Sequence, residues 1–183
     1  DANFNLKALV HKFERTNEEF LRERVNVPQA KELLVVLPDG FTTEICPGAE
    51  SWWSAAADSL RLGRLLTLDY GLHAEEFFAV HRTEGTLRAY RRHRNSVDLL
   101  ANAGAQDITA HVNFTQIQAA GEKAGLRTEL AAKQADFIVG LAKSFWARAE
   151  QNGDWSAQRN RELQTLMHPE HLGRAFRVLV QSR

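Results

Sequence analysis

Short apolar runs alternate with helix-spaced apolar residues through the middle of the chain. Residues 65–68 form a nearly continuous leucine-rich run between Gly63 and Gly71. Such a run is typical of a strand buried on both faces, as in a parallel sheet covered by helices. The run stops on a carboxylate, Asp69, which is followed by an aromatic ring, Tyr70. We therefore expect a central strand at residues 64–69.

Apolar spacing and end signals predict the other elements. Pro47 suits a first helical position, Asn113 is a good N-cap and Gly125 a good stop. Helical patterns lie at residues 47–61, 114–124, 133–150 and 156–167, with a shorter one near 75–80. Extended patterns lie at residues 41–45, 86–90, 107–112, 127–131 and 176–180, and residues 95–106 read as a long loop. Strands that alternate with helices predict an α/β fold.

The N-terminal region allows two interpretations. Residues 3–9 suggest a helical turn. In residues 10–27, Phe13 and Phe20 would line one face of a helix, but two extended stretches around residues 16–18 also match a hairpin. We predict the β-hairpin and keep the helix as the alternative.

Composition bounds the class of protein. The chain has 183 residues and ordinary globular composition, so we expect a single domain over residues 1–183. Formal net charge is zero, which argues against a nucleic-acid partner. The apolar runs are far shorter than the roughly 20 residues that a membrane helix needs, so no membrane partner is expected. The single Cys46 excludes an intrachain disulfide and favours a reducing compartment, the cytoplasm.

Asp69 and Tyr70 are the first candidate site residues. In open α/β sheets, ligands bind outside the carboxyl ends of the strands, which is where Asp69 would stand. The alternative is that Asp69 only caps the following turn. Spacing alone favours this capping role.

A second group lies at residues 107–111. Asp107, Thr109 and His111 alternate, so on a strand they would share one face. They would then offer a carboxylate, a hydroxyl and an imidazole to a substrate. The alternative is a polar network that orients the next helix. The sequence favours neither interpretation over the other.

The stretch from residue 88 to residue 94 is the only concentrated basic segment. It includes Arg88 and Tyr90 and would suit an acidic or phosphate-bearing partner. The alternative is a solvated face balanced by nearby acids, and the zero net charge favours it. The acids in question are Glu75, Glu76 and Glu84.

The remaining candidates are isolated. Glu44 would anchor a cationic substrate. The alternative is that its negative charge only interacts favourably with the dipole at the N-terminus of the helix that begins at Pro47. His168 and His171 flank a proline that breaks the helical spacing, so no metal site is expected. Cys46 lacks an obvious histidine partner and is expected to be a packed thiol.

Several longer motifs carry a family resemblance. They are LLTLDYG at 65–71, GTLRAYRRHR at 85–94 and QDITAHVNF at 106–114, with GFTTEICPGAESW at 40–52, QADFIVGL at 134–141 and GRAFRVL at 173–179. In this order they resemble the MidA-like methyltransferases, which are related to the arginine methyltransferase of mitochondrial complex I assembly. The resemblance runs from Gly40 to the C-terminus.

The resemblance carries expectations about fold and activity. It implies a Rossmann-like class I methyltransferase sheet, in which the last strand, residues 174–181, lies antiparallel between residues 64–69 and 127–131. It also implies S-adenosylmethionine as cofactor of the complete protein and a protein substrate, with arginine as the modified side chain. The basic stretch at residues 88–94 would shape the groove for that protein. The mitochondrial matrix becomes an alternative location.

Two departures limit the resemblance. The eleven glycines never form the Gly-x-Gly-x-Gly pattern of a cofactor loop. Near the start, Lys7 stands where the family's motif has an aspartate, and the acidic residue after Asn3 is absent. The chain therefore resembles only the C-terminal half of such an enzyme. We do not expect it to bind S-adenosylmethionine alone.

Two functions remain open at this point. The chain is the substrate-side half of a methyltransferase, or it is an inactive binding or assembly module. In either case the resemblance implies that residues 64–69 lack the neighbouring strand that they have in the family's sheet. We expect this edge to pair with a missing N-terminal half or with a second copy.

Overall fold

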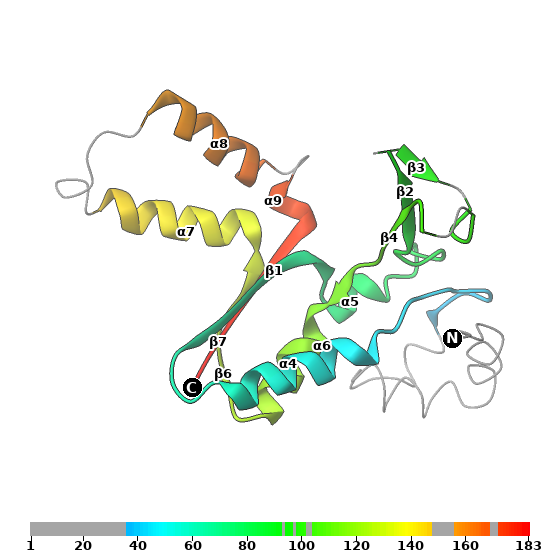
Figure 1. Cartoon of the computed structure of the whole chain (residues 1–183), viewed down its shortest axis with the longest axis horizontal. Coiled ribbons are helices and arrows are strands. Elements are labelled where there is room, and N and C mark those ends of the chain that lie inside the picture. Colours follow the sequence, from blue (N-terminus) through cyan, green and yellow to red (C-terminus); the bar gives the residue numbers. More distant parts are fainter. Residues whose placement is uncertain (1–35, 93, 97, 102–103, 148–155, 169–171) are drawn as a thin grey trace. The chain divides into compact units, whose positions relative to one another are not determined.

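A computed structural model describes residues 36–92, 94–96, 98–101, 104–147, 156–168 and 172–183 (Figure 1). The chain divides into two compact units. One comprises residues 1–47 and 73–110, and the other residues 48–72 and 111–183. The predicted turn at residues 3–9 and the predicted hairpin at residues 10–27 lie outside the described residues.

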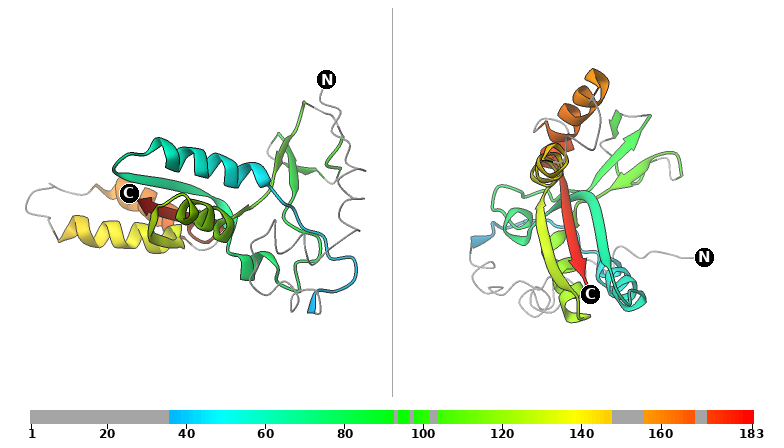
Figure 2. Two further views of the ribbon diagram at one scale, coloured as in Figure 1. Left: turned by 90° about the horizontal axis from the view of Figure 1, so that it is seen from below. Right: turned by 90° about the vertical axis from the view of Figure 1, so that its left-hand side faces the viewer.

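A four-stranded sheet forms the second unit, in the order β5-β1-β7-β6. Its strands are β1 (Arg64–Leu72), β5 (Val112–Asn113), β6 (Arg127–Lys133) and β7 (Phe176–Ser182). The last strand runs antiparallel between β1 and β6, and β5 pairs parallel with the end of β1 (Figure 2). This confirms the predicted strand order. The predicted last strand began two residues too early, since residues 174 and 175 end a helix.

The helices begin and end close to the predicted positions. They are α4 (Pro47–Ser59), α6 (Phe114–Lys123), α7 (Gln134–Trp146), α8 (Ala157–Met167) and α9 (Leu172–Ala175). The Asn113 side chain accepts a hydrogen bond from the backbone N–H of Gln116, as an N-cap should. Gly125 has φ +84, a left-handed conformation that glycine adopts without steric cost after a helix.

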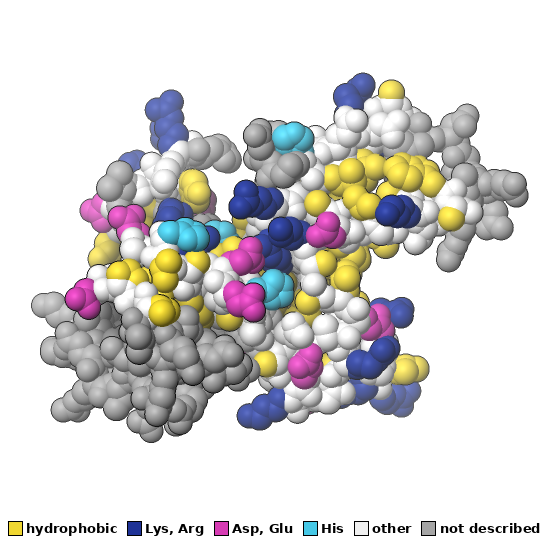
Figure 3. Space-filling view, turned by 180° about the vertical axis from the view of Figure 1, so that it is seen from behind, with side chains coloured by type: hydrophobic (Ala, Val, Ile, Leu, Met, Phe, Trp, Pro, Cys, Tyr) yellow, Lys and Arg dark blue, Asp and Glu magenta, His cyan; other side chains and the backbone are white. Residues whose placement is uncertain are grey.

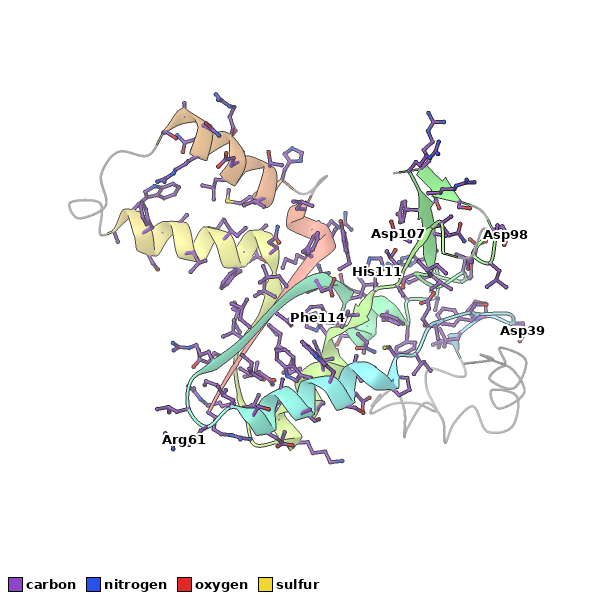
Figure 4. The ribbon with its side chains drawn as sticks, in the orientation of Figure 1. Asp39, Arg61, Asp98, Asp107, His111 and Phe114 are labelled. Carbon is purple, nitrogen blue, oxygen red and sulfur yellow. The ribbon has the colours of Figure 1, made fainter. Side chains whose placement is uncertain are left out.

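The core of this unit lies between one face of the sheet and helices α4 and α6. Trp53 from α4, Phe114 and Ile117 from α6 and Leu179 from β7 form one buried cluster. Leu65 of β1 packs against it. Figure 4 labels Phe114 at the start of α6. Because Leu65 and Leu179 point to the same face, α4 and α6 cover that face of the sheet.

The opposite face of β1 is less well covered. Leu66 and Leu68 are 50% and 40% exposed, so the prediction of burial on both faces is wrong. Successive side chains of a strand point to opposite faces, and α4 and α6 cover only the face of Leu65. Within the described ranges, residues 64–70 also pair only with β7. One edge and one apolar face of β1 are therefore open in this part of the chain.

Helices α7, α8 and α9 pack on one another, and α7 and α9 also contact β6 and β7. Figure 3 shows hydrophobic side chains gathered over α7 and α8. Leu141, Trp146 and Leu166 are among the exposed large apolar side chains. The apolar stripe predicted for residues 133–150 is thus only partly buried.

A three-stranded antiparallel sheet, in the order β3-β2-β4, forms the first unit. Its elements are α5 (Ala74–Phe77), β2 (Arg88–Arg91), β3 (Arg94–Ser96) and β4 (Asp107–Thr109). Phe77, Phe78 and Ala89 are buried here. Thr42 forms an isolated parallel bridge to Glu84, so the predicted strand at residues 41–45 reduces to one bridge.

Two further expectations concern Cys46 and membranes. The thiol of Cys46 is exposed, so the prediction of a packed thiol is wrong. It lies in the irregular segment before α4. Among the described residues, no helix has both the length and the apolar character that crossing a bilayer requires.

Candidate functional site

Three rings gather near the C-terminal end of β1. The ring of Tyr70 lies 4.0 Å from that of Phe176, with the planes tilted by 40°. The His111 ring lies 6.4 Å from the Tyr70 ring in an edge-on arrangement at 89°. Tyr70 remains 45% exposed, so solvent and ligands can reach its ring. We call Tyr70, His111 and Phe176 the aromatic group.

Strand register brings these three residues together. Tyr70 stands directly opposite Phe176 in the β1–β7 pair. The next residue, Gly71, pairs with Val112, which places His111 beside the end of β1. A Cβ at Gly71 would meet the Phe114 ring and the Val112 carbonyl, so only glycine allows this close approach. The aromatic group thus depends on Gly71, which allows β5 to approach β1, and on β7, which comes from the C-terminal end of the chain.

Asp69 does not end its strand as the sequence predicts. The strand continues to Leu72 because β5 pairs with Gly71 and Leu72. The exposed carboxylate of Asp69 accepts a hydrogen bond of 2.7 Å from the backbone N–H of Tyr70. Since neighbouring residues of a strand point to opposite faces, Asp69 faces away from the aromatic group.

In the other unit, four predicted site residues meet across two strands. Arg88 stands opposite Thr109, and Tyr90 stands opposite Asp107. Residues two apart on a strand share a face, so all four side chains lie on one face of this sheet. The intervening Ala89 is fully buried. The arrangement offers a cation, a phenol, a carboxylate and a hydroxyl side by side.

Arg88 is only partly available to a ligand. Its guanidinium donates to the Leu87 carbonyl at 2.6 Å and to the Gly85 carbonyl at 3.5 Å. It also lines an open cavity of about 200 Å³ together with residues 81–85. Backbone contacts therefore fix the direction of this side chain.

Glu44 is held by donors of its own unit. Its carboxylate accepts from the Thr86 and Leu87 backbone N–H groups at 2.7 and 2.5 Å and from the Thr86 hydroxyl at 3.0 Å. These bonds tie residues 41–45 to the turn before β2. Its predicted role as an anchor for a cationic substrate stays a prediction.

The expected alternation of Asp107, Thr109 and His111 on one strand is wrong. Strand β4 ends at Thr109, and the second strand, β5, begins only at Val112. Asp107 and Thr109 share a face of β4, whereas His111 belongs to the other unit. The break at residues 110–111 falls on the boundary between the two units, a tertiary feature that alternation cannot reveal.

Sequence patterns did not identify Phe176 as a member of the site. Phe176 joins the aromatic group only through the register of β7, for which the sequence carries no local signal. The sequence did single out the basic stretch at residues 88–94, and within it Arg91, Arg92 and Arg94 line one open cavity of about 590 Å³. The density of arginines in this stretch was the signal for them.

Shifted pKa values occur in the second unit at Arg64, Glu122 and Glu129, none of which belongs to the aromatic group. The hydrogen bond from Arg64 Nε to Glu129, 2.6 Å long, lowers the pKa of Glu129 and raises that of Arg64. Hydrogen bonds from Thr128 and then from Gln118 lower the pKa of Glu122. These groups link α6, β1 and β6 and are structural.

The fold of this chain is similar to those of two solved structures. A structure of a protein from Burkholderia thailandensis bound to S-adenosyl-homocysteine matches with a TM-score of 0.71 and 28% sequence identity, over 86% of this chain and 41% of the other. A native structure of a protein from the same organism matches with a TM-score of 0.70 and 28% identity, over 86% of this chain and 44% of the other. The chain thus spans less than half the length of these proteins.

Comparison with curated proteins finds no match. Comparison with protein families gives one, to the model described as "Putative S-adenosyl-L-methionine-dependent methyltransferase", over residues 5–132. This match begins nearer the N-terminus than the sequence motifs, which start at Gly40. It covers most of the chain, including β1 and most of β6. The chain therefore belongs to this family of S-adenosyl-L-methionine-dependent methyltransferases.

Proposed function

We propose that this chain is the substrate-binding half of a methyltransferase that modifies a protein side chain, with arginine as the target. The observation that carries the proposal is the 86% overlap with a solved structure that holds S-adenosyl-homocysteine. The sheet supports it, since an antiparallel last strand between β1 and β6 is the order expected for the C-terminal half of a class I methyltransferase.

The aromatic group is suited to a guanidinium. Cations are attracted to the faces of aromatic rings, and arginine stacks on them more often than lysine does. Tyr70 has one side against Phe176 and remains 45% exposed. In the proposal an arginine side chain of the target rests on this ring, which orients its nitrogen for reaction.

The described residues do not fit the cofactor. Five glycines with positive φ occur in the described ranges, and each stands alone in its turn: Gly40, Gly63, Gly85, Gly104 and Gly125. No glycine-rich loop between a strand and a helix is formed by them. S-adenosylmethionine supplies an electrophilic methyl group, and in the proposal another part of the complete enzyme binds it.

The free edge of β1 supports the proposal of an incomplete sheet. Residues 64–70 pair on one side only in the described part of the chain, and Leu66 and Leu68 lie open beside them. Unpaired strand edges are templates for further strands. We propose that this edge pairs with the N-terminal half of the enzyme or with a second copy of the chain.

A second function remains a candidate. The absence of a Gly-x-Gly-x-Gly pattern anywhere in the sequence favours a binding or assembly module that retains the fold without cofactor binding. In that case the aromatic group would still bind a partner protein. Binding of an arginine peptide alone therefore does not separate the two functions, but methyl transfer by the complete enzyme does.

The chain has two tyrosines, which allows a direct test. We would label the protein with 3-fluorotyrosine, assign its fluorine signals with Tyr70→Phe and Tyr90→Phe, and add an arginine-containing peptide. The Tyr70 signal should shift with saturation, and the Tyr90 signal should not. A lysine-for-arginine peptide is the control and should bind more weakly. An unchanged Tyr70 signal would contradict the role of the aromatic group.

Methyl transfer tests the enzyme itself. The complete enzyme carrying Tyr70→Ala should methylate arginine peptides at least about tenfold less efficiently than the same enzyme carrying Tyr90→Ala. Equal rates would remove the aromatic group from substrate binding. No transfer by the unaltered complete enzyme would favour the assembly module.

A further inference from the structure

The tip of the β2–β3 hairpin is densely cationic. Arg91 and Arg94 form a directly opposed cross-strand pair, and Arg92 begins the turn between them. All three residues line one open cavity of about 590 Å³. Figure 4 shows nitrogen-tipped side chains extending from this hairpin. We call these three residues the arginine tip.

Two features of the arginine tip are energetically unfavourable for a β-hairpin. Like charges directly opposite each other on antiparallel strands destabilise the pair. Arg92 has φ +49, and it is the single non-glycine residue with positive φ in the described ranges. Left-handed backbone is unfavourable for a residue with a Cβ. Local costs of this kind tend to persist at functional sites.

The charges of the arginine tip are not neutralised within the described residues. None of the three arginines forms an ion pair with another described residue, whereas Arg64 and Arg127 of the other unit both pair with Glu129. Arg88, the fourth arginine of the stretch, instead donates to backbone carbonyls and lies outside the tip. Three exposed arginines therefore line one open cavity without an ion-pair partner among the described residues.

We propose that the arginine tip is a docking site for an acidic segment of the protein substrate. This inference rests on the proposed function and names a second chemical feature of its substrate, apart from the side chain that is modified. Guanidinium groups bind carboxylates through paired N–H donors in a fixed geometry. Aspartate or glutamate side chains two or three residues apart would reach adjacent arginines of the tip.

Charge and geometry favour a protein over a nucleic acid. Affinity for nucleic acid comes mainly from many phosphate contacts, whereas the whole chain, this tip included, has zero formal net charge. Stacking of bases requires an aromatic surface beside the cations. Tyr90 precedes Arg91 on the same strand and therefore points to the opposite face of the hairpin.

Fluorescence anisotropy with a labelled octaglutamate peptide tests the proposal. The variant Arg91→Gln/Arg92→Gln/Arg94→Gln should lose at least about tenfold in affinity, roughly 1.4 kcal/mol. The control Arg61→Gln/Arg159→Gln/Arg161→Gln removes the same charge from exposed arginines of the other unit and should stay within about twofold of the parent. Equal losses in both variants would show non-specific attraction and overturn the site.

Competition identifies the class of partner. A single-stranded oligonucleotide of similar charge should compete more weakly than the peptide, and stronger competition would overturn the assignment to protein. Because binding is measured without methyl transfer, the site can fail while the proposed function stands, and the reverse also holds.

The variant Arg92→Gly tests whether Arg92 contributes to peptide binding at a cost in the stability of the fold. Glycine adopts positive φ freely, so the variant should unfold at a higher urea concentration than the parent. It also lacks one guanidinium and should bind the peptide several-fold more weakly. This opposite change in stability and binding is the expected signature of a strained binding residue. Weaker stability, or unchanged affinity, would contradict it.

Discussion

The indole Nε1 of Trp53 donates a hydrogen bond of 2.7 Å to the side-chain oxygen of Gln181, 128 residues further along the chain. The Gln181 side chain is fully buried. Its Nε2 donates to the Gln118 carbonyl at 3.0 Å and to the Thr128 hydroxyl at 2.9 Å. One amide thereby joins α4, α6, β6 and β7 inside the core.

Gln181→Leu should destabilise the protein by about 1–3 kcal/mol, because it leaves the buried Trp53 N–H without its acceptor. Urea unfolding followed by tryptophan fluorescence measures this. Gln158→Leu is the control, since the exposed Gln158 bonds to the exposed Glu162 on the same helix, α8. A Gln181→Leu variant as stable as the control would contradict the role of the network.

Two helical glycines should respond in opposite directions to alanine. A Cβ at Gly121 would meet Gln181 and Trp53, which cannot move away in the packed core, so Gly121→Ala should cost about 1–3 kcal/mol. A Cβ at Gly140 meets nothing within 4 Å, so Gly140→Ala should stabilise α7 by about 0.5–1 kcal/mol. Thermal unfolding of both variants measures the difference. Similar shifts of the midpoint would be inconsistent with the packing around Gly121.

Stability should depend on the ionisation of Glu122. Hydrogen bonds from Thr128 and Gln118 lower the pKa of Glu122 in the folded state. Because the pKa of Glu122 is lower in the folded than in the unfolded protein, its ionisation stabilises the fold at pH values above the ordinary glutamate pKa. This stabilisation is lost as the pH falls through the pKa of the folded protein. Thr128→Val should raise the Glu122 pKa, whereas Thr128→Ser, which keeps the hydroxyl, should leave it low. Carbon-13 titration of the carboxyl groups decides between these outcomes.

The open edge and face of β1 should cause association. Sedimentation of the purified chain at micromolar concentration should show self-association, unless an N-terminal half is supplied. Leu68→Lys should shift the distribution towards monomer, because it places a charge on the open face. Leu62→Lys is the control, because Leu62 is even more exposed, at 83%, but precedes the strand. A monodisperse parent monomer would show that the edge is covered from within the chain.

The chain alone should not bind S-adenosylmethionine tightly, because it contains no glycine-rich cofactor loop. Isothermal titration calorimetry checks this. A dissociation constant of about 1 μM or lower, near −8 kcal/mol, would contradict the proposal that the cofactor is bound elsewhere.

Local signals in the sequence predicted most of the elements. Pro47, Asn113 and Gly125 mark helix ends because their backbone preferences act over a few residues. The apolar run at residues 65–68 identified β1 for the same reason, since the preference of such a run for extended structure is local. The family resemblance, not periodicity, supplied the position of β7 between β1 and β6.

Tertiary structure alone decided the candidate sites. Phe176 contacts Tyr70 because of the β1–β7 register. The Glu44 carboxylate accepts hydrogen bonds from the backbone N–H groups of residues 86 and 87. His111 lies outside the strand that contains Asp107. The open face of Leu66 and Leu68 likewise depends on which helices are present to cover it. Sequence by itself determined where chain segments become helical or extended, because those preferences are local. It could not determine which side chains meet, because strand pairing joins residues that are far apart in the chain.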